Sequence, residues 1–120
     1  MTDLRKRGAA KPIVMIVLLV LLLVAGVVLI KEAGAQGKAH SIADILNLEL
    51  NNGPTDEEVH EKLGMTPTTT RNPTPRKYVE EYSNKGLLRT YTVYAYYRTG
   101  AANFLEAVSV NEKIPKWESE

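Results

Sequence analysis

The chain of 120 residues contains no cysteine. Without a thiol there is no disulfide framework, no cysteine-based zinc site, no thiol nucleophile and no site for S-acylation. The lipid anchor of a bacterial lipoprotein is excluded as well, because that lipid is attached to a cysteine. Any folded part of this chain must therefore be stable through its own core.

Residues that commonly carry catalysis are few, and they form no recognisable constellation. The two histidines are His40 and His60, and we expect His60 to be a lone, solvated helix residue rather than a metal ligand. Glu80 and Glu81 are neighbours on a predicted strand and point to opposite faces, so they cannot form an acid–base pair. No glycine-rich phosphate loop or nucleophile elbow is present. We therefore expect a protein that is no enzyme, with no catalytic, cofactor or metal site and no small-molecule substrate.

A strong charge of one sign is also lacking beyond the N-terminal segment. Residues 31–120 carry eleven Lys or Arg and thirteen Asp or Glu, which gives a formal charge of −2. These charges are interspersed, and no basic patch with interleaved aromatic residues occurs among them. This pattern argues against nucleic acid as a partner.

What the chain does have is one long apolar segment, residues 13–30. These eighteen consecutive positions are uncharged, and fifteen of them are Ile, Leu or Val. A helix of this length measures about 27 Å, close to the hydrocarbon thickness of a bilayer. A surface helix of a soluble domain would show a polar stripe, which this segment does not have. We therefore predict a transmembrane helix over residues 13–30, with the lipid bilayer as one partner.

The flanks of this segment predict its orientation. Four basic residues within positions 5–11 precede it, whereas Lys31 and Glu32 cancel on the far side. The positive-inside rule then keeps residues 1–12 in the cytoplasm and makes the C-terminal part extracytoplasmic, in the periplasm. A cleaved signal peptide is the alternative, because residues 33–35 (Ala-Gly-Ala) fit a cleavage site. An uncleaved signal-anchor is favoured, since the apolar run is longer than that of a usual signal peptide.

Residues 31–40 are small, polar and glycine-containing, which predicts a flexible tether between the membrane and a folded domain. Apolar residues then recur at helical spacing from Ile42 to Leu50, and Ser41 is a candidate N-cap for a first short helix. A strand over residues 45–50 is the alternative for this stretch.

A second short helix has clearer local signals. Thr55 and Glu58 form a capping box, and the three carboxylates of the first turn suit the positive end of the helix dipole. Gly64 provides a left-handed stop. Val59 and Leu63 lie on one face, and we expect this face to pack on the core.

The rest of the chain is predicted to form a sheet. Residues 65–77 contain three prolines and five threonines, which predicts an extended loop. Residues 78–83, 87–98 and 103–110 have strand composition and are separated by turns, so they predict a three-stranded antiparallel meander. We therefore predict an α+β domain over residues 41–111, with two short helices and three strands, followed by a frayed tail over residues 112–120.

The order of these elements resembles that of the BamE-like (SmpA/OmlA) family of small bacterial envelope proteins. Their pattern is a Gly-x-Thr turn, a helix carrying Glu or Gln before Val, a Leu-Gly-x-Pro stop and three antiparallel strands. The resemblance covers about residues 41–110. The corresponding positions are Gly53, Thr55, Val59, Leu63, Gly64 and Pro67.

Two departures limit what this resemblance implies. Family members with a role in outer-membrane assembly are typically lipoproteins anchored by an N-terminal cysteine, which this chain lacks. The stop after the helix, residues 63–67, is also one residue longer than the usual pattern. The resemblance thus implies an α+β fold and a location in the cell envelope, rather than a role in the assembly machine.

The six tyrosines all lie between positions 78 and 97. On the long strand, we expect Tyr91, Val93 and Tyr97 to pack on the helices, because alternate residues share one face. Tyr94 and Tyr96 would then lie on the open face, with Arg98 beside them. Exposed tyrosines are common at protein interfaces, whereas cross-strand packing on a two-sided sheet is the alternative explanation.

These observations together predict a membrane-tethered extracytoplasmic interaction module of the bacterial envelope. Its partner would be an envelope protein bound through Tyr94, Tyr96 and Arg98. Two alternatives remain open at this stage. The first is an accessory subunit that is recruited to a membrane complex through its transmembrane helix, and the second is a domain secreted after cleavage of a signal peptide.

Overall fold

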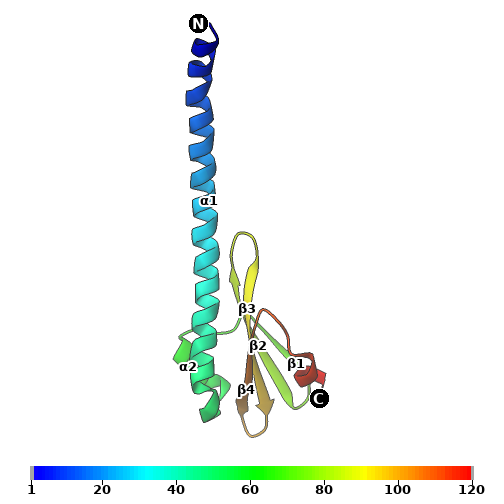
Figure 1. Ribbon diagram of the computed structural model, residues 1–120. Helices are drawn as coiled ribbons and strands as arrows, with labels where there is room; N and C mark the ends of the chain where they lie inside the picture. The colour runs from blue at the N-terminus through cyan, green and yellow to red at the C-terminus, as the bar shows by residue number, and fades with distance from the viewer. Residues whose placement is uncertain (1, 120) are drawn as a thin grey trace.

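The chain forms a long helix, a short helix and a four-stranded antiparallel sheet, which confirms the predicted α+β class with an apolar N-terminal helix (Figure 1). The computed structural model describes the backbone of residues 2–119 and the side chains of residues 12–119. The basic flank predicted over positions 5–11 lies outside these described side chains. In chain order the elements are α1 (Thr2–Glu49), the 3-10 turn η1 (Leu50–Asn52), α2 (Asp56–Leu63), β1 (Thr69–Thr74), β2 (Lys77–Lys85), β3 (Thr90–Thr99), β4 (Asn103–Val110) and α3 (Pro115–Ser119).

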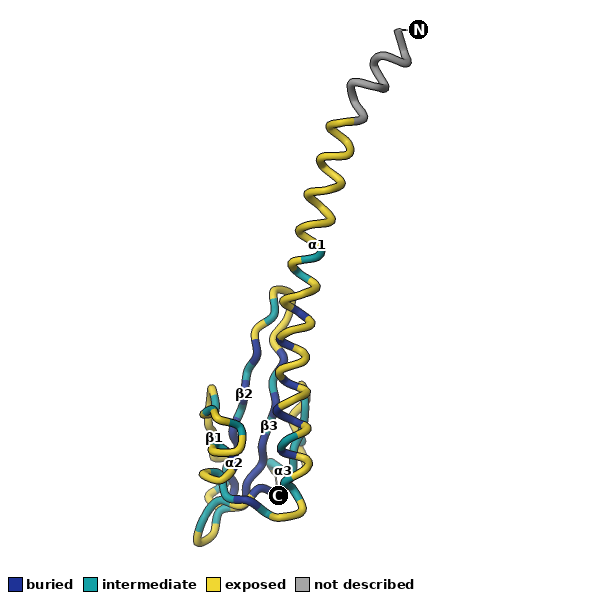
Figure 2. The backbone as a smooth tube through the Cα atoms, turned by 90° about the vertical axis from the view of Figure 1, so that its left-hand side faces the viewer, coloured by how far each residue is buried: buried dark blue, intermediate teal, exposed yellow. Residues whose placement is uncertain are grey.

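One part of helix α1 is exposed, and its C-terminal part packs on the domain (Figures 1 and 2). It has 48 residues, which corresponds to about 72 Å of helix. Residues 13–30 stand clear of the sheet, and Leu22 and Ile30 keep 71% and 73% of their surface exposed. Within the described part of the chain, α1 is the one helix long and apolar enough to cross a membrane. Such a surface is stable in hydrocarbon and poorly solvated by water.

Residues 31–40 are helical, so the prediction of a flexible tether is wrong. The small residues of this stretch allow close packing: Ala35 and Ala39 are buried, and Leu46 continues their stripe toward the end of α1. Alanine favours a helix, and its small side chain lets the sheet approach the helix axis. Ser41 therefore lies inside α1 instead of capping a separate helix. The first predicted short helix is the C-terminal part of α1.

Helix α2 agrees with the local signals that predicted it. The hydroxyl of Thr55 accepts a hydrogen bond from the backbone N–H of Glu58 (3.2 Å). Gly64 ends the helix at φ 66°, a left-handed conformation that glycine adopts without strain. Val59 is buried, and Leu63 packs against the core cluster. The expected inward face of this helix is confirmed.

The sheet has the order β1-β2-β3-β4, and each neighbouring pair is antiparallel. Strands β2, β3 and β4 correspond to the three predicted strands. The additional strand β1 lies within the segment predicted as a loop and pairs Thr69 with Glu81. Its threonines suit a strand, and Pro73 is tolerated because β1 is an edge strand whose register shifts there. The predicted three-stranded meander is thus a four-stranded one.

Alternation along β3 separates a face toward α1 and α2 from an outer face. Tyr91, Val93 and Tyr97 belong to the core together with the buried residues of α1, as predicted. The outer face is partly covered, because the segment predicted as a frayed tail forms α3 and lies beside β1 (Figure 1). The prediction of a frayed tail is therefore wrong for residues 115–119.

Candidate functional site

The outer face of the sheet carries the three residues predicted to bind a partner. Tyr94, Tyr96 and Arg98 alternate along β3, and the first two rings stack with their centroids 6.4 Å apart. Tyr94 is partly exposed, and the side chain of Arg98 is 56% exposed. Because β3 buries its other face against the helices, these three residues point away from α1.

Tyr96 is fully buried, so the prediction of its exposure is wrong. The indole of Trp117 in α3 packs on its ring, with 4.8 Å between the centroids. The hydroxyl of Tyr96 accepts a hydrogen bond from the backbone N–H of Ile114 (2.9 Å). Burial under this segment raises the pKa of Tyr96. Helix α3 has only five residues, which is too short to show a hydrophobic period. The sequence therefore contained no sign that this helix covers Tyr96.

Two basic side chains of the sheet fasten α3 in place. Lys77 is buried, its Nζ lies 4.8 Å from the ring centroid of Trp117, and it donates to the carbonyl oxygen of the same residue. Arg71 of β1 pairs with Glu81 at 2.7 Å and also with Glu118 of α3. Helix α3 is therefore an ordered part of the outer face.

A β-bulge determines the surroundings of Arg98. The pairing of β3 with β4 skips Glu106, which has no ladder partner of its own. Its two carboxylate oxygens accept hydrogen bonds from Arg98, at 2.7 and 2.9 Å. These bonds hold the pKa of Glu106 below its usual value. The result is a guanidinium that Glu106 holds in one orientation on the exposed surface, where its planar face is suited to stacking on an aromatic ring.

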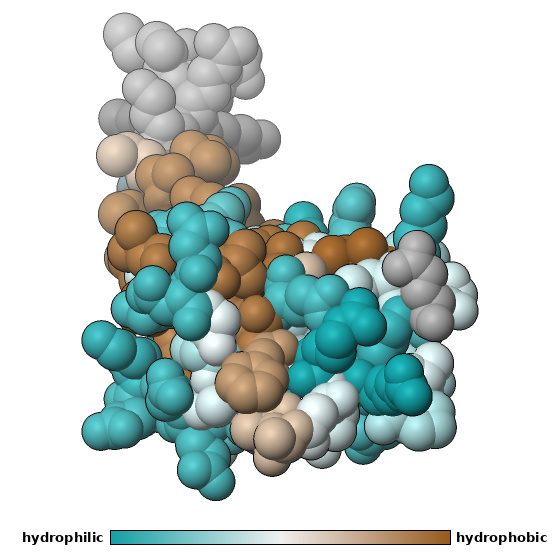
Figure 3. Space-filling model, turned by 90° about the horizontal axis from the view of Figure 1, so that it is seen from below, coloured by the Kyte–Doolittle hydropathy of each residue, from teal (hydrophilic) through white to brown (hydrophobic). Residues whose placement is uncertain are grey.

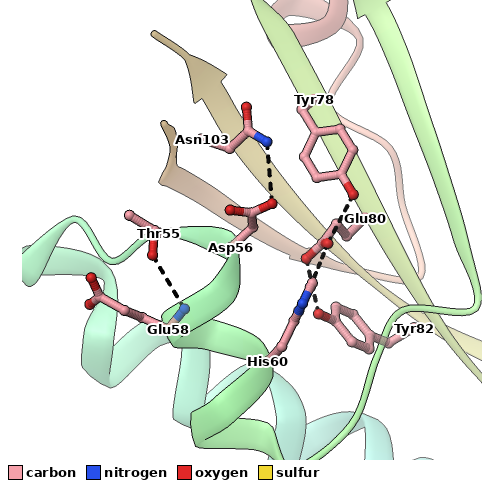
Figure 4. A network of polar contacts seen from close by, with 8 residues as sticks. All are labelled: Thr55, Asp56, Glu58, His60, Tyr78, Glu80, Tyr82 and Asn103. Atoms are coloured by element: carbon pink, nitrogen blue, oxygen red, sulfur yellow. Dashed lines mark hydrogen bonds and ion pairs between the residues drawn. The ribbon is translucent and has the colours of Figure 1, made fainter. Parts of the chain in front are cut away.

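A second polar cluster lies between α2 and the sheet and is centred on Glu80, which is fully buried (Figure 4). Tyr82 donates to its Oε1 and Tyr78 to its Oε2, both at 3.0 Å. Nε2 of His60 lies 2.6 Å from the same Oε2. Burial and the charge of Glu80 raise the pKa of both tyrosines, which keeps them protonated as donors.

The prediction of a lone, solvated His60 is therefore wrong. Its partner Glu80 is 20 residues away on another element, and no local pattern connects the two. The sequence did contain one sign that Glu80 is buried. Tyr78, Glu80 and Tyr82 alternate along β2 and therefore share the face of the strand that points to the core.

The cluster around Glu80 is suited to holding the fold together. Three donors converge on one buried carboxylate, which compensates for its loss of hydration and joins α2 to the sheet. Across residues 12–119, no group of three His, Cys, Asp or Glu side chains is placed to hold a metal ion. We therefore assign this cluster a structural role and take the outer sheet face as the candidate binding site.

Comparison with protein-family models, with curated proteins and with solved structures finds no match to this chain.

Proposed function

We propose that this chain is a membrane-anchored, non-enzymatic interaction module of the bacterial envelope. In this proposal residues 13–30 cross the membrane, the N-terminus lies in the cytoplasm and the α+β domain lies outside it. The observation that carries the proposal is the continuity of α1, in which an exposed apolar half runs without interruption into a half that forms part of the domain core. The resemblance to BamE-like proteins supports the envelope location only.

Helix continuity gives this anchor a particular property. A domain on a flexible tether samples many orientations, whereas a domain whose core includes the membrane helix keeps one orientation relative to that helix. Hydrophilic side chains predominate at the end of the domain farthest from the N-terminus (Figure 3), which suits a water-exposed position. A fixed height and orientation favour a module that presents one surface to a neighbouring envelope protein.

An uncleaved anchor also suits the packing of α1 better than a cleaved signal peptide does. Cleavage after Ala35 would remove Glu32, whose carboxylate is hydrogen-bonded to Leu88 and Tyr91 of the β2–β3 hairpin. Ala35 itself is buried and helical.

In this proposal the partner binds on the outer sheet face, where Tyr94 is partly exposed and Arg98 is exposed. Tyr94 stacks on Tyr96, which in turn contacts Trp117 of α3, so a partner on Tyr94 would lie near this helix as well. Tyr96 supports the surface from below in this arrangement, since it carries the indole of Trp117. This assignment keeps the predicted site but changes the role of Tyr96 from contact to support.

The test replaces one part of the chain at a time and measures co-purification of the envelope partner. One variant exchanges residues 13–30 for an unrelated apolar helix of equal length, and the other combines Tyr94→Ala with Arg98→Ala. Partner binding should survive the exchanged anchor and be lost from the double variant. The opposite result would identify the chain as an accessory subunit recruited through its membrane helix. A periplasmic reporter fused after residue 119 should be active, and an inactive fusion would contradict the proposed topology.

A further inference from the structure

The turn between β2 and β3, residues 86–89, lies beside α1 close to the end of its apolar run (Figures 1 and 2). Glu32 holds it there: its carboxylate accepts hydrogen bonds from the backbone N–H of Leu88 and from the hydroxyl of Tyr91 (2.8 Å). A Cβ atom at Gly86 would collide with this carboxylate, so glycine allows the close approach.

These contacts define the height of the turn relative to a bilayer. Glu32 comes two residues after Ile30, which is about 3 Å along the helix axis. Helix side chains also tilt toward the N-terminus, and therefore toward the membrane in this chain. The polar interface on each side of the hydrocarbon core is about 5–7 Å thick. When residues 13–30 occupy the core, the turn lies within this interface.

The composition of the turn matches that position. Leu87 and Leu88 are 52% and 76% exposed, and together they form an apolar tip on the hairpin. Basic residues flank it, with Lys85 before the tip and Arg89 after it, both exposed. Apolar side chains flanked by Lys or Arg are typical of segments that lie in the interface, where the cations meet lipid phosphates.

We propose that the 86–89 turn is a second membrane contact of this chain, made with the leaflet on the side of the domain. Leu87 and Leu88 enter the boundary between headgroups and acyl chains, while Lys85 and Arg89 lie at the level of the phosphates. This proposal rests on the proposed membrane anchor. Two contacts with one bilayer determine both the tilt of the domain and its rotation about α1, so the outer sheet face keeps one direction relative to the membrane surface.

The absence of cysteine allows a direct test. Three single-cysteine variants of the full chain, Leu88→Cys, Leu48→Cys and Ile30→Cys, carry one environment-sensitive fluorophore each. They are reconstituted into vesicles of phosphatidylcholine and phosphatidylglycerol that contain a nitroxide-labelled lipid as quencher. Leu48 is the matched control, because it is a leucine of α1 that is 79% exposed and lies near the far end of the helix. Position 30 reports on the anchor itself.

We expect the label at position 88 to emit at shorter wavelength than the label at position 48 and to be quenched several-fold more strongly. Quenching at position 30 with water-like emission at position 88 would overturn the hairpin contact and leave the anchor intact. Water-like emission at position 30 as well would overturn both the anchor and the contact that rests on it.

Discussion

The carboxylate of Glu32 accepts a hydrogen bond from the hydroxyl of Tyr91, 2.8 Å away and 59 residues further along the chain. This bond joins the first turn of α1 beyond the apolar run to the start of β3. With the N–H of Leu88 on the other carboxylate oxygen, it closes the hairpin onto the helix next to the apolar run. Beyond Glu32, the buried residues from Ala35 to Leu46 continue the contact between α1 and the domain.

The first prediction concerns the pH dependence of this closure. The hydrogen bond from Leu88 lowers the pKa of Glu32, so the closure is fully present above the unfolded pKa and is lost as pH falls through the lower, folded one. Hydrogen exchange of the Leu88 amide, corrected for its intrinsic rate, should accelerate once the pH falls below the usual pKa of a glutamate side chain. The Glu32→Gln variant should show no such transition. An identical pH profile in both proteins would mean that another group holds the hairpin.

The second prediction concerns the packed half of α1. Leu46 is 1% exposed, so Leu46→Ala should lower the free energy of unfolding by about 2–5 kcal/mol through lost burial and a residual cavity. Leu48 lies two positions away and is 79% exposed, so Leu48→Ala should change it by less than about 0.5 kcal/mol. Urea unfolding in detergent micelles, followed by the fluorescence of the single tryptophan, measures both. Equal effects would mean that the helix does not dock as described.

The third prediction concerns the buried carboxylate. Glu80→Gln replaces two acceptor oxygens by one oxygen and an amide, which leaves at least one of its three donors without a suitable acceptor. We expect a loss of about 1–3 kcal/mol in the free energy of unfolding, measured by the same urea titration. Glu61→Gln on the exposed side of α2 is the matched control and should be nearly neutral. Indistinguishable unfolding midpoints would remove the structural role assigned to this cluster.

The fourth prediction concerns three tyrosines of the domain interior at alkaline pH, two from the Glu80 cluster and Tyr97 of β3. Burial raises the pKa of Tyr78, Tyr82 and Tyr97 above the usual value of 10.0. The stability that depends on the neutral tyrosines is fully present below this value. It is lost as the pH rises through the higher pKa values of the folded state. A spectrophotometric titration should show these tyrosines ionising only as the domain unfolds. Tyr82→Phe should remove one of the late-ionising groups. Ionisation near pH 10.0 while the fold persists would contradict the described burial.

The fifth prediction distinguishes Tyr96, which supports α3 from within the domain, from Tyr94, which would contact the partner on the outer sheet face. Tyr96 is fully buried, so Tyr96→Ala should cost about 3–5 kcal/mol of stability. Tyr94→Ala should cost much less, since its ring is partly exposed, while weakening partner binding by about 1–2 kcal/mol. Thermal unfolding and partner titration of the two variants measure these effects. A stable Tyr96→Ala protein that has lost its partner would restore Tyr96 as a contact residue.

Local signals predicted much of this structure. The uncharged run before Lys31 predicted a long apolar helix. Thr55 as the N-cap and Gly64 as the C-terminal stop predicted α2. Alternation on β3 correctly predicted which residues face the helices. Each of these features depends on neighbours within a few residues, where periodicity and capping are informative.

The errors arose where distant contacts decide the outcome. The small residues of positions 31–40 suggested a flexible tether. In the structure, the small size of Ala35 and Ala39 instead allows α1 to approach the sheet closely. The pairing of His60 with Glu80 joins α2 to β2, and burial of Tyr96 requires the C-terminal segment to fold back. Tertiary packing of this kind overrides local propensity and leaves no periodic signal.

In the proposed function, one rigid helix serves as both membrane span and core element. Spin labels at Leu22→Cys and Leu48→Cys, both at exposed positions, test it by pulsed distance measurement on the full chain in bilayers. A continuous helix places these positions about 39 Å apart, so we predict a single narrow distribution near that value. A broad distribution extending to shorter distances would show a flexible break between membrane and domain and would contradict the account.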